Sequence, residues 1–337
     1  MADYLSCCFK KALIVLQFAQ VEVILHNIND IAPVARWLLL CNLYLKYMDT
    51  TGQLLRIAIQ SKGRLYEDTT SLFKESGIKI NRSERALLVR SNNFPVEVLY
   101  LRDDDIPETV ASGVADLGVV GLNEVLEREE DVDTLLHLGV SKCHLAIAVP
   151  KHADYSGPQW LENKRIATSY PNILNRYLSR HNVKAQVHVI TGSVEITPLI
   201  GLGDAIFDIV SSGSTLVTNN LKEVENVVDS DAVIIANRSL SPEKKETVKE
   251  LLFRFQAAID AQKKKYVMMN APKDKIKAIL DILPECAKSP TIIPLADDQW
   301  CSIHTVLEEK QFWDIVSDLK KEGAQGILVM NIEKMVL

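Results

Sequence analysis

The sequence has no excess of basic residues. Its 337 residues include 38 Lys and Arg against 44 Asp and Glu, which gives a formal net charge of −6 at pH 7. Proteins that bind nucleic acid without sequence preference usually carry a positive excess, because much of their affinity comes from phosphate contacts. The composition therefore disfavours nucleic acid as a partner, whereas a small anionic substrate needs only a local cluster of positive charge.

Cysteine is scarce and scattered along the chain. The six cysteines include no Cys-x-x-Cys pair, and their spacing suggests no disulfide framework. This pattern disfavours the common zinc modules and the small secreted domains that disulfides hold together. We therefore expect reduced thiols in a cytoplasmic protein, because disulfides persist mainly outside the reducing cytosol.

No hydrophobic run is long enough to span a bilayer. The apolar segment 10–25 begins with two lysines, but Gln17, Gln20 and Glu22 interrupt it and no small-residue cleavage site follows, so it is a poor export signal. The segment 37–45 is much shorter than the roughly 20 apolar residues that a membrane helix needs. We expect no association with a membrane.

From residue 54 onward, short apolar runs alternate with amphipathic segments. Strands are predicted at 54–60, 96–102, 116–121, 143–150, 165–167, 185–192, 205–210 and 233–239, and helices at 66–76, 106–113 and 172–180. Gly77 follows the first helix as its expected C-terminal stop. Strands that alternate with helices indicate an α/β fold with mainly parallel sheets.

The C-terminal part begins with a long amphipathic helix. Ser241 is a suitable N-cap, Pro242 fits the first helical position, and the pattern extends to about Met269. The segments beyond it follow the order strand, helix, strand, strand, helix, strand, which is typical of a ferredoxin-like domain. Small domains of this type often bind amino acids as regulatory modules, but the fold alone does not establish that role.

The segment 195–216 is the most informative part of the sequence. It contains Glu195, places Asp208 in an apolar run typical of a buried strand, and continues into a helix expected to begin near Leu216. The small loop between the strand and the helix consists of Ser211, Ser212, Gly213, Ser214 and Thr215. Such a unit suits a phosphate, because backbone N–H groups and the helix dipole favour an anion at a helix N-terminus. A solvated turn after a core strand is the alternative for the loop taken alone.

Two common catalytic signatures are missing from the sequence. The loop after Asp208 lacks the Gly-Lys-Ser/Thr ending of a Walker A motif, which disfavours an ordinary P-loop NTPase. No Gly-x-Ser-x-Gly elbow presents a nucleophilic serine. A reaction on a phosphorylated substrate is therefore expected to proceed without a serine-linked intermediate.

The segment 195–216 resembles the signature of the ATP phosphoribosyltransferase family, the enzymes that begin histidine biosynthesis. The signature positions present here are Glu195, Gly201, Gly203, Asp208, Ser212, Gly213, Thr215 and Leu216. Further segments similar to the family lie at 55–65, 101–107, 116–123, 165–172, 264–272 and 289–300. The last two belong to a C-terminal region that only the long form of the enzyme carries.

The resemblance implies an α/β core with two lobes, like a type II periplasmic binding protein, and a C-terminal ferredoxin-like (ACT-like) βαββαβ regulatory domain. The active site is expected in the cleft between the lobes. The implied boundaries are 48–149 for lobe I, completed by about 236–264, then 150–235 for lobe II with the phosphoribosyl loop, and 265–337 for the regulatory domain. Residues 1–47 match nothing in the family, and we interpret them as an N-terminal extension, with Met48 as a hypothetical native start.

The resemblance also implies a reaction. N1 of the ATP adenine attacks C1 of 5-phosphoribosyl 1-pyrophosphate, which gives 1-(5-phosphoribosyl)-ATP and pyrophosphate. An oxocarbenium-like transition state requires in-line placement of the reactants, neutralisation of the pyrophosphate by Mg²⁺ and basic side chains, and a fixed ribose. The Mg²⁺ ion is expected to be held mainly by the substrate phosphates, with Glu195 or Asp208 as candidate protein ligands.

Candidate site residues follow from this reaction. Glu195, Asp208, Lys62 and Arg102 are the catalytic candidates: the two acids would hold the ribose hydroxyls and the two cations would meet the pyrophosphate. The loop 211–215, together with Asp208, would bind the phosphoribosyl group. The ATP and pyrophosphate side is expected to include Gly63, Arg64, Thr168, Ser169 and Tyr170.

Each of these assignments has a structural alternative. Glu195 could serve only as an acid at a helix N-terminus, and the segment 62–64 could be a solvated basic turn. Arg102 could simply pair with the three aspartates that follow it, and Tyr170 could belong to the core. The motif favours the functional assignment for Glu195, whereas Tyr170 is evenly balanced between the two.

By resemblance, the C-terminal domain binds histidine as a feedback inhibitor, and the enzyme forms a homo-oligomer, either a dimer or a hexamer. Asp297 and Asp298 are candidate histidine contacts, with a solvated loop as the alternative. Two other classes stay open: a solute-binding or ligand-sensing protein on the same fold, and a catalytically silent regulatory subunit. The first would not need the phosphate loop, and loss of Lys62, Arg102 or that loop would favour the second, but all of them are present.

Overall fold

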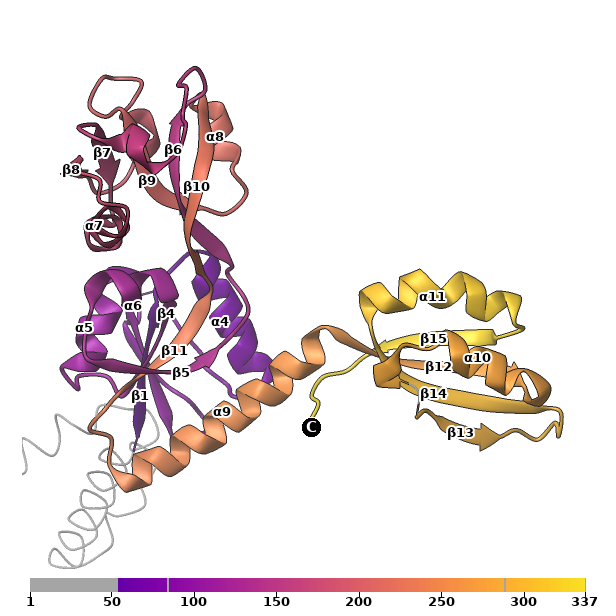
Figure 1. Ribbon diagram of the computed structural model, residues 1–337. Coiled ribbons are helices and arrows are strands. Elements are labelled where there is room, and N and C mark those ends of the chain that lie inside the picture. The colour runs from indigo at the N-terminus through magenta and orange to yellow at the C-terminus, as the bar shows by residue number, and fades with distance from the viewer. Residues whose placement is uncertain (1–53, 84, 288, 337) are drawn as a thin grey trace, which may run out of the picture. The chain divides into compact units, whose positions relative to one another are not determined.

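The computed structural model describes residues 54–83, 85–287 and 289–336, and the predicted extension at 1–47 lies outside them. This part of the chain contains three β-sheets, of six, five and four strands (Figure 1). Each sheet packs against its own helices, and each has its own buried apolar residues. These three units match the two lobes and the small C-terminal domain expected from the sequence.

The first sheet has the strand order β2-β3-β1-β4-β11-β5. Its strands are β1 (Leu55–Gln60), β2 (Leu88–Arg90), β3 (Val96–Leu101), β4 (Leu117–Gly121), β5 (Val132–His137) and β11 (Ala232–Asn237). Its helices are α4 (Arg64–Glu75), α5 (Ile106–Ala111), α6 (Leu122–Arg128) and the long α9 (Pro242–Gln262). Strand β1 pairs in parallel with β3 and β4, whereas the pairs β2–β3, β4–β11 and β11–β5 are antiparallel.

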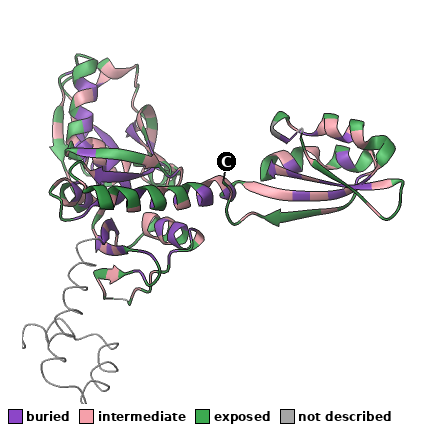
Figure 2. Cartoon of the chain, turned by 90° about the horizontal axis from the view of Figure 1, so that it is seen from below, coloured by how far each residue is buried: buried purple, intermediate pink, exposed green. Residues whose placement is uncertain are grey.

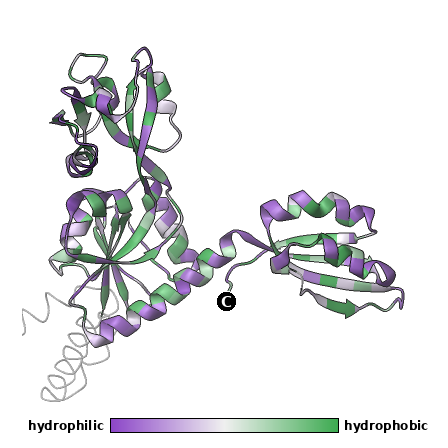
Figure 3. Cartoon of the chain, in the orientation of Figure 1, coloured by the Kyte–Doolittle hydropathy of each residue, from purple (hydrophilic) through white to green (hydrophobic). Residues whose placement is uncertain are grey.

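Helices cover both faces of the first sheet. The odd-numbered residues of β1 pack with α4 and α9, where Phe73 and Phe255 meet edge to face with their ring centroids 5.3 Å apart. Ala58 points to the opposite face, which α5 covers. Strands buried on both faces are apolar along their whole length, and Figure 3 shows this concentration of apolar residues on the sheet. Figure 2 shows that one face of α9 is exposed, whereas the opposite face buries residues such as Leu251 and Phe255 against the sheet.

The second sheet has the strand order β10-β6-β9-β7-β8. Its strands are β6 (Cys143–Pro150), β7 (Arg165–Thr168), β8 (Gln186–Val189), β9 (Ala205–Val210) and β10 (Leu221–Ser230). Helix α7 (Pro171–Arg180) packs on one face and the short α8 (Ser214–Thr218) on the other. Strand β7 pairs in parallel with β8 and β9, so the chain segments that follow β7 and β9 leave the sheet at the same edge.

The C-terminal sheet has the antiparallel order β13-β14-β12-β15. Its strands are β12 (Lys264–Pro272), β13 (Thr291–Pro294), β14 (Trp300–Glu308) and β15 (Gln325–Asn331), and its helices are α10 (Ile276–Ile282) and α11 (Glu309–Lys321). Counted within this domain, the order is 2-3-1-4, which is the ferredoxin-like arrangement expected from the sequence.

The expectation of mainly parallel sheets was wrong. In the first two sheets of the described chain, four strand pairs are parallel and five are antiparallel. The antiparallel pairs arise largely where β10 and β11 return the chain from the second sheet to the first. Strand β10 was not predicted, because five of its ten residues are charged or amide-bearing and its apolar residues do not alternate regularly.

Three predicted boundaries also differ from the structure. The helix expected to extend to Met269 ends at Gln262, because the residues from Lys264 pair along their full length with β14. The helix at whose N-terminus Glu195 could lie is only a 3₁₀ turn, Val194–Ile196. The lobe boundary placed at residues 149 and 150 lies at the end of β6, whereas the chain enters the second sheet at the start of that strand.

Candidate functional site

Strand β9, the loop after it and helix α8 form the strand–loop–helix unit that the sequence predicts. The helix begins at Ser214, two residues earlier than expected. Gly213 adopts a φ of 71°, a left-handed conformation that favours glycine, and the chain turns there into the helix. The Ser212 and Ser214 hydroxyls lie 2.9 Å apart, and Ser211 and Thr215 are also exposed. The unit therefore presents several hydroxyl groups and the first-turn amides of a helix to solvent.

Asp208 lies on β9, three residues before this loop. Its Oδ1 accepts a hydrogen bond from the backbone N–H of Ile209 at 2.8 Å. The pKa of Asp208 is raised to about 6, mainly by burial and to a smaller extent by the negative charge of Glu195, whereas the Ile209 N–H lowers it. The structure thus brings the two predicted acids into electrostatic contact, in surroundings that disfavour their combined negative charge.

The segment 168–170 leaves the second sheet at the same edge as the Asp208 segment, because Thr168 of β7 pairs with Phe207 of β9. Thr168 is fully buried and its Oγ1 accepts a hydrogen bond from the Tyr170 N–H at 2.8 Å. The Ser169 hydroxyl donates to the Ile190 carbonyl at 2.7 Å. These bonds fix the backbone at Tyr170. Burial is the main cause that raises the pKa of the Tyr170 hydroxyl, followed by Glu124, and the charge of Asp208 also contributes.

The basic residues of the first lobe lie at one edge of the first sheet. The Ser61 N–H donates to the Leu101 carbonyl at 2.8 Å, so the chain segments that follow β1 and β3 stay together. Lys62, Gly63 and Arg64 follow β1 and are exposed, with Gly63 at a φ of 93°. Arg102 follows β3, with 76% of its side chain exposed and Nη2 donating to Asp104 Oδ2 at 3.1 Å. The predicted cations therefore share one edge, and the ion pair expected as the alternative for Arg102 is also present.

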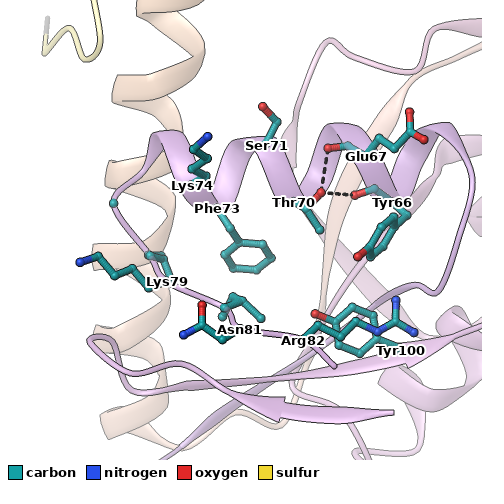
Figure 4. Close-up of a pocket in the computed structure, with 13 residues that line it drawn as sticks. Tyr66, Glu67, Thr70, Ser71, Phe73, Lys74, Lys79, Asn81, Arg82 and Tyr100 are labelled. Carbon is teal, nitrogen blue, oxygen red and sulfur yellow. Dashed lines mark hydrogen bonds between the residues drawn. The ribbon is translucent and has the colours of Figure 1, made fainter. Parts of the chain in front are cut away.

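A cavity of about 640 Å³ lies elsewhere on the first lobe, between α4 and the segment 77–82 (Figure 4). Phe73, Tyr66 and Tyr100 form much of its lining, and the Arg82 guanidinium carbon lies 3.8 Å from the centre of the Tyr100 ring. None of the predicted site residues lines this cavity. The predicted site residues lie instead at strand ends and in loops, where Lys62, Arg102 and the loop after Asp208 are exposed and Thr168 and Tyr170 are buried.

A buried polar cluster at Tyr170 was not predicted. Glu124 and Asn123 of α6, which are 6% and 5% exposed, hydrogen-bond to the Tyr170 hydroxyl. Their signal in the sequence is weak, because two polar residues in a short helix are usually exposed and their partner is more than 40 residues away. The Tyr170 ring is buried, as its structural alternative expects, and its hydroxyl is hydrogen-bonded within this cluster.

The C-terminal candidates lie in a turn far along the chain from the other site residues. Asp297 Oδ1 accepts a hydrogen bond from the Gln299 N–H at 2.9 Å, and the Asp297 carbonyl accepts one from the Trp300 N–H at 3.0 Å. Asp298 is exposed. Their contact with histidine stays a prediction, because a carboxylate that closes its own turn needs no ligand.

The sheets and the strand–loop–helix unit define a two-lobed α/β protein, here joined to a ferredoxin-like domain. Residues 102–257 match the family model HisG: ATP phosphoribosyltransferase, and residues 261–334 match the model HisG, C-terminal domain. The chain belongs to the ATP phosphoribosyltransferase family, which confirms the resemblance seen in the sequence.

Individual relatives agree with this assignment. The ATP phosphoribosyltransferase of Bacteroides fragilis is 60% identical over 284 residues, which cover 84% of this chain and 100% of that protein. The enzyme of Cytophaga hutchinsonii is 52% identical over 282 residues, covering 84% and 98%. The solved structure of an ATP phosphoribosyl transferase (HisG:HisZ) complex from Thermotoga maritima is similar with a TM-score of 0.55 and 29% identity, covering 61% of this chain and 99% of that one.

The chain is accordingly a pentosyltransferase of the class EC 2.4.2.17. It condenses ATP with 5-phosphoribosyl 1-pyrophosphate in the first step of L-histidine biosynthesis. Enzymes of this family generally use a metal ion. Among the helices that the structure describes, none combines the length and the apolar character that a membrane span requires.

Proposed function

We propose that the unit formed by β9, the loop 211–213 and α8 binds the phosphoribosyl group of 5-phosphoribosyl 1-pyrophosphate. The observation that carries this proposal is the exposure of the loop hydroxyls beside the first-turn amides of α8, directly after Asp208. A 5-phosphate accepts hydrogen bonds from both kinds of donor. Gly213 allows the chain to turn there without a side chain over the phosphate.

Asp208 and Glu195 are assigned to the ribose hydroxyls. A carboxylate can accept two hydroxyl hydrogen bonds, and bonds to a charged acceptor are stronger than neutral ones. The raised pKa of Asp208 shows that its charge lacks sufficient partners within the protein itself. Ribose hydroxyls supply such partners, and so does the partial positive charge that develops at C1 in the transition state.

Lys62, Arg64 and Arg102 are assigned to the pyrophosphate and the ATP phosphates, with Gly63, Thr168, Ser169 and Tyr170 on the nucleotide side. Arg102 can turn toward an anion at small cost, because its side chain is mostly exposed and its bond to Asp104 is an exposed ion pair. In this assignment, cations surround the leaving group and the acids lie at the ribose. Attack by the adenine nitrogen then needs only in-line placement and no covalent intermediate with the enzyme.

We assign the metal ion to Mg²⁺, which would neutralise the pyrophosphate charge as it departs. No group of three or more metal-ligating side chains occurs within the described ranges, so substrate phosphates would supply most of the ligands. Glu195 and Asp208 fit as contributors, because a cation would offset the burial and the Glu195 charge that together raise the pKa of Asp208.

The remaining assignments concern feedback regulation, oligomeric state and cellular location. We propose that the C-terminal domain binds histidine as a feedback inhibitor, with Asp297 and Asp298 as candidate contacts, and that the enzyme acts as a dimer or hexamer in the cytoplasm. The family match of residues 261–334 supports the presence of the regulatory domain. Inhibition from a separate domain would require a shift between conformations or assemblies.

The test is an assay with ATP, 5-phosphoribosyl 1-pyrophosphate and Mg²⁺, in which pyrophosphatase draws the reaction forward. Product formation is measured by the near-ultraviolet absorbance of the product. Asp208→Ala is expected to lower kcat/KM by at least about 100-fold, because it removes a charged group at the reacting ribose. Asp154→Ala, an exposed acid of the same lobe, is the matched control and should keep full activity. Added histidine should lower the rate.

Two results would count against these assignments. Full activity in Asp208→Ala would remove Asp208 from the reacting centre. Product formation by the wild type that histidine does not affect would leave the catalytic assignment intact and would contradict the regulatory one.

A further inference from the structure

Helix α6 of the first lobe and helix α7 of the second lobe are joined by a set of hydrogen bonds. Glu127 Oε1 and Oε2 accept bonds from the N–H groups of Asn172 and Ile173, at 2.9 and 3.0 Å. The Asn172 side chain donates to the Glu127 carbonyl at 2.9 Å. The two helices therefore hold each other at their ends, next to the segment that carries Tyr170.

Glu124, one turn earlier on α6, is bonded to Tyr170 itself. The Tyr170 hydroxyl donates to Glu124 Oε1 at 3.0 Å, and Asn123 Nδ2 donates to the same oxygen at 3.1 Å. The Ser230 hydroxyl in turn donates to Asn123 Oδ1 at 2.9 Å, which fixes the orientation of the amide. Tyr170 is 8% exposed, so its hydroxyl has little access to water as a substitute partner.

The second oxygen of Glu124 points toward the basic residues of the first lobe. Arg128 Nε lies 3.7 Å from Glu124 Oε2, and Arg128 Nη2 lies 3.6 Å from Asp104 Oδ2. Asp104 also accepts the bond from Arg102. A continuous polar chain thus connects Arg102, at the pyrophosphate side of the proposed site, with Tyr170, at the nucleotide side.

We propose that Glu124 is a positioning residue for the transfer reaction, which holds Tyr170 of the second lobe in the orientation that ATP requires. The inference rests on the proposed placement of Tyr170 at the nucleotide side. Glu124 itself touches no substrate in this proposal. It acts through the bond from its Oε1 to the Tyr170 hydroxyl, and its charge toward Arg128 is secondary.

Three observations favour such a role over one in stability alone. Burial raises the pKa of Glu124, which the Tyr170 hydrogen bond and Arg128 oppose, so the carboxylate is in a costly position. The bond joins α6, which packs on the first sheet, to the residue that begins α7, which packs on the second. The bonded tyrosine lies close enough to the predicted acid Asp208 for the charge of Asp208 to affect its pKa.

The experiment compares the KM for ATP, the KM for 5-phosphoribosyl 1-pyrophosphate, kcat and the Tm across variants of the full chain. Glu124→Gln keeps an oxygen that can accept the Tyr170 bond but removes the charge, whereas Glu124→Asp keeps the charge but shortens the side chain by one methylene. We expect Glu124→Gln to stay within about threefold of the wild type. Glu124→Asp and Glu124→Ala should each raise the KM for ATP about tenfold, as expected for the loss of one buried hydrogen bond.

Tyr170→Phe and Glu130→Ala complete the set. Tyr170→Phe should raise the KM for ATP as much as Glu124→Ala, and the double variant should be no worse than either single one, because both remove the same bond. Glu130, just beyond α6, is the matched control, and Glu130→Ala should leave all constants unchanged.

The outcomes separate this inference from the proposed function. If Tyr170→Phe leaves the KM for ATP unchanged, both the nucleotide role of Tyr170 and the positioning role of Glu124 are wrong. If Tyr170→Phe raises it but neither Glu124→Asp nor Glu124→Ala does, only the role of Glu124 is wrong. A lowered Tm with unchanged kinetic constants would assign Glu124 to stability, and a KM that rises in Glu124→Gln but not in Glu124→Asp would show that charge, not the bond, matters.

Discussion

Asp208 bears a charge that its surroundings disfavour. Burial and the neighbouring Glu195 raise its pKa to about 6, although the Ile209 N–H stabilises the ionised form. Selection for stability alone would not favour a carboxylate in such a place, and strained or unpaired groups are common where a substrate supplies the missing partner. The electrostatics of this residue therefore agree with the role that its motif predicts.

A stability measurement checks this interpretation of Asp208. Asp208→Asn keeps an oxygen for the Ile209 N–H and removes the charge. The ordinary pKa of 3.8 applies to the unfolded chain and about 6 to the folded one. Well below pH 3.8 the group is neutral in both states, so the variant and the wild type should unfold alike. As pH rises from 4 through 6, the folded wild type loses stability relative to the variant, by up to about 3 kcal/mol above pH 7.

Urea unfolding of both proteins between pH 4.5 and 7.5 gives this difference directly. Asp154→Asn, at an exposed position of the same lobe, should show no such trend. A difference between Asp208→Asn and the wild type that does not grow with pH would show that the charge of Asp208 is not destabilising.

At the scale of elements, features set by neighbouring residues, such as caps and turns, were predictable from the sequence. Contacts between helices that pack on different sheets were not. Ser241 caps α9 by accepting a bond from the Lys244 N–H at 3.3 Å, and Gly77 follows α4 with a φ of 74°, as their residue types predict. The strand and loop around Asp208 were predictable because the whole motif is contiguous. The bond between Glu124 and Tyr170 was not predictable, because it depends on how α6, which packs on the first sheet, contacts the start of α7, which packs on the second.

Helix α7 shows how a contact with another helix can stabilise the start of a helix. The helix begins after Tyr170 without a side-chain cap of its own, and the Glu127 carboxylate from α6 accepts the bonds from its first N–H groups. Glu127→Ala would leave these groups unpaired, the Ile173 N–H in a buried position and the Asn172 N–H in a partly buried one, and we expect a loss of about 2–3 kcal/mol in the free energy of unfolding. Ser241→Ala removes an exposed, local cap and should cost only about 1 kcal/mol.

Equilibrium urea unfolding of the two variants against the wild type measures both losses. Glu127→Gln, which retains one acceptor oxygen, should fall between Glu127→Ala and the wild type. A loss for Glu127→Ala no larger than that for Ser241→Ala would show that solvent replaces the carboxylate at the start of α7.

At the scale of the whole molecule, the buried apolar residues form separate clusters that follow the sheets. The cluster of the C-terminal sheet draws only on residues between Val267 and Ile327, and it includes both α10 and α11. Residues of the first sheet pack instead with α4 and α9. The family models divide the chain at nearly the same place, between residues 257 and 261. The C-terminal domain therefore has a core that requires no residue from the catalytic lobes.

We expect a fragment of residues 262–337 to fold without the rest of the chain. Its sheet is complete, and its core is formed by its own residues, although domains of this size are only marginally stable. Circular dichroism should show mixed helix and strand content, and urea should unfold the fragment in one cooperative transition. Leu319→Ala, which empties a fully buried position on α11, should strongly lower the urea concentration at the midpoint of unfolding, because large-to-small changes in a core cost about 2–5 kcal/mol.

An unfolded wild-type fragment would show that the domain depends on α9. The chain returns to α9 through the bond from the Met335 N–H to the Ala257 carbonyl. Restored folding in a fragment that starts at residue 241 would then identify α9 as the missing part.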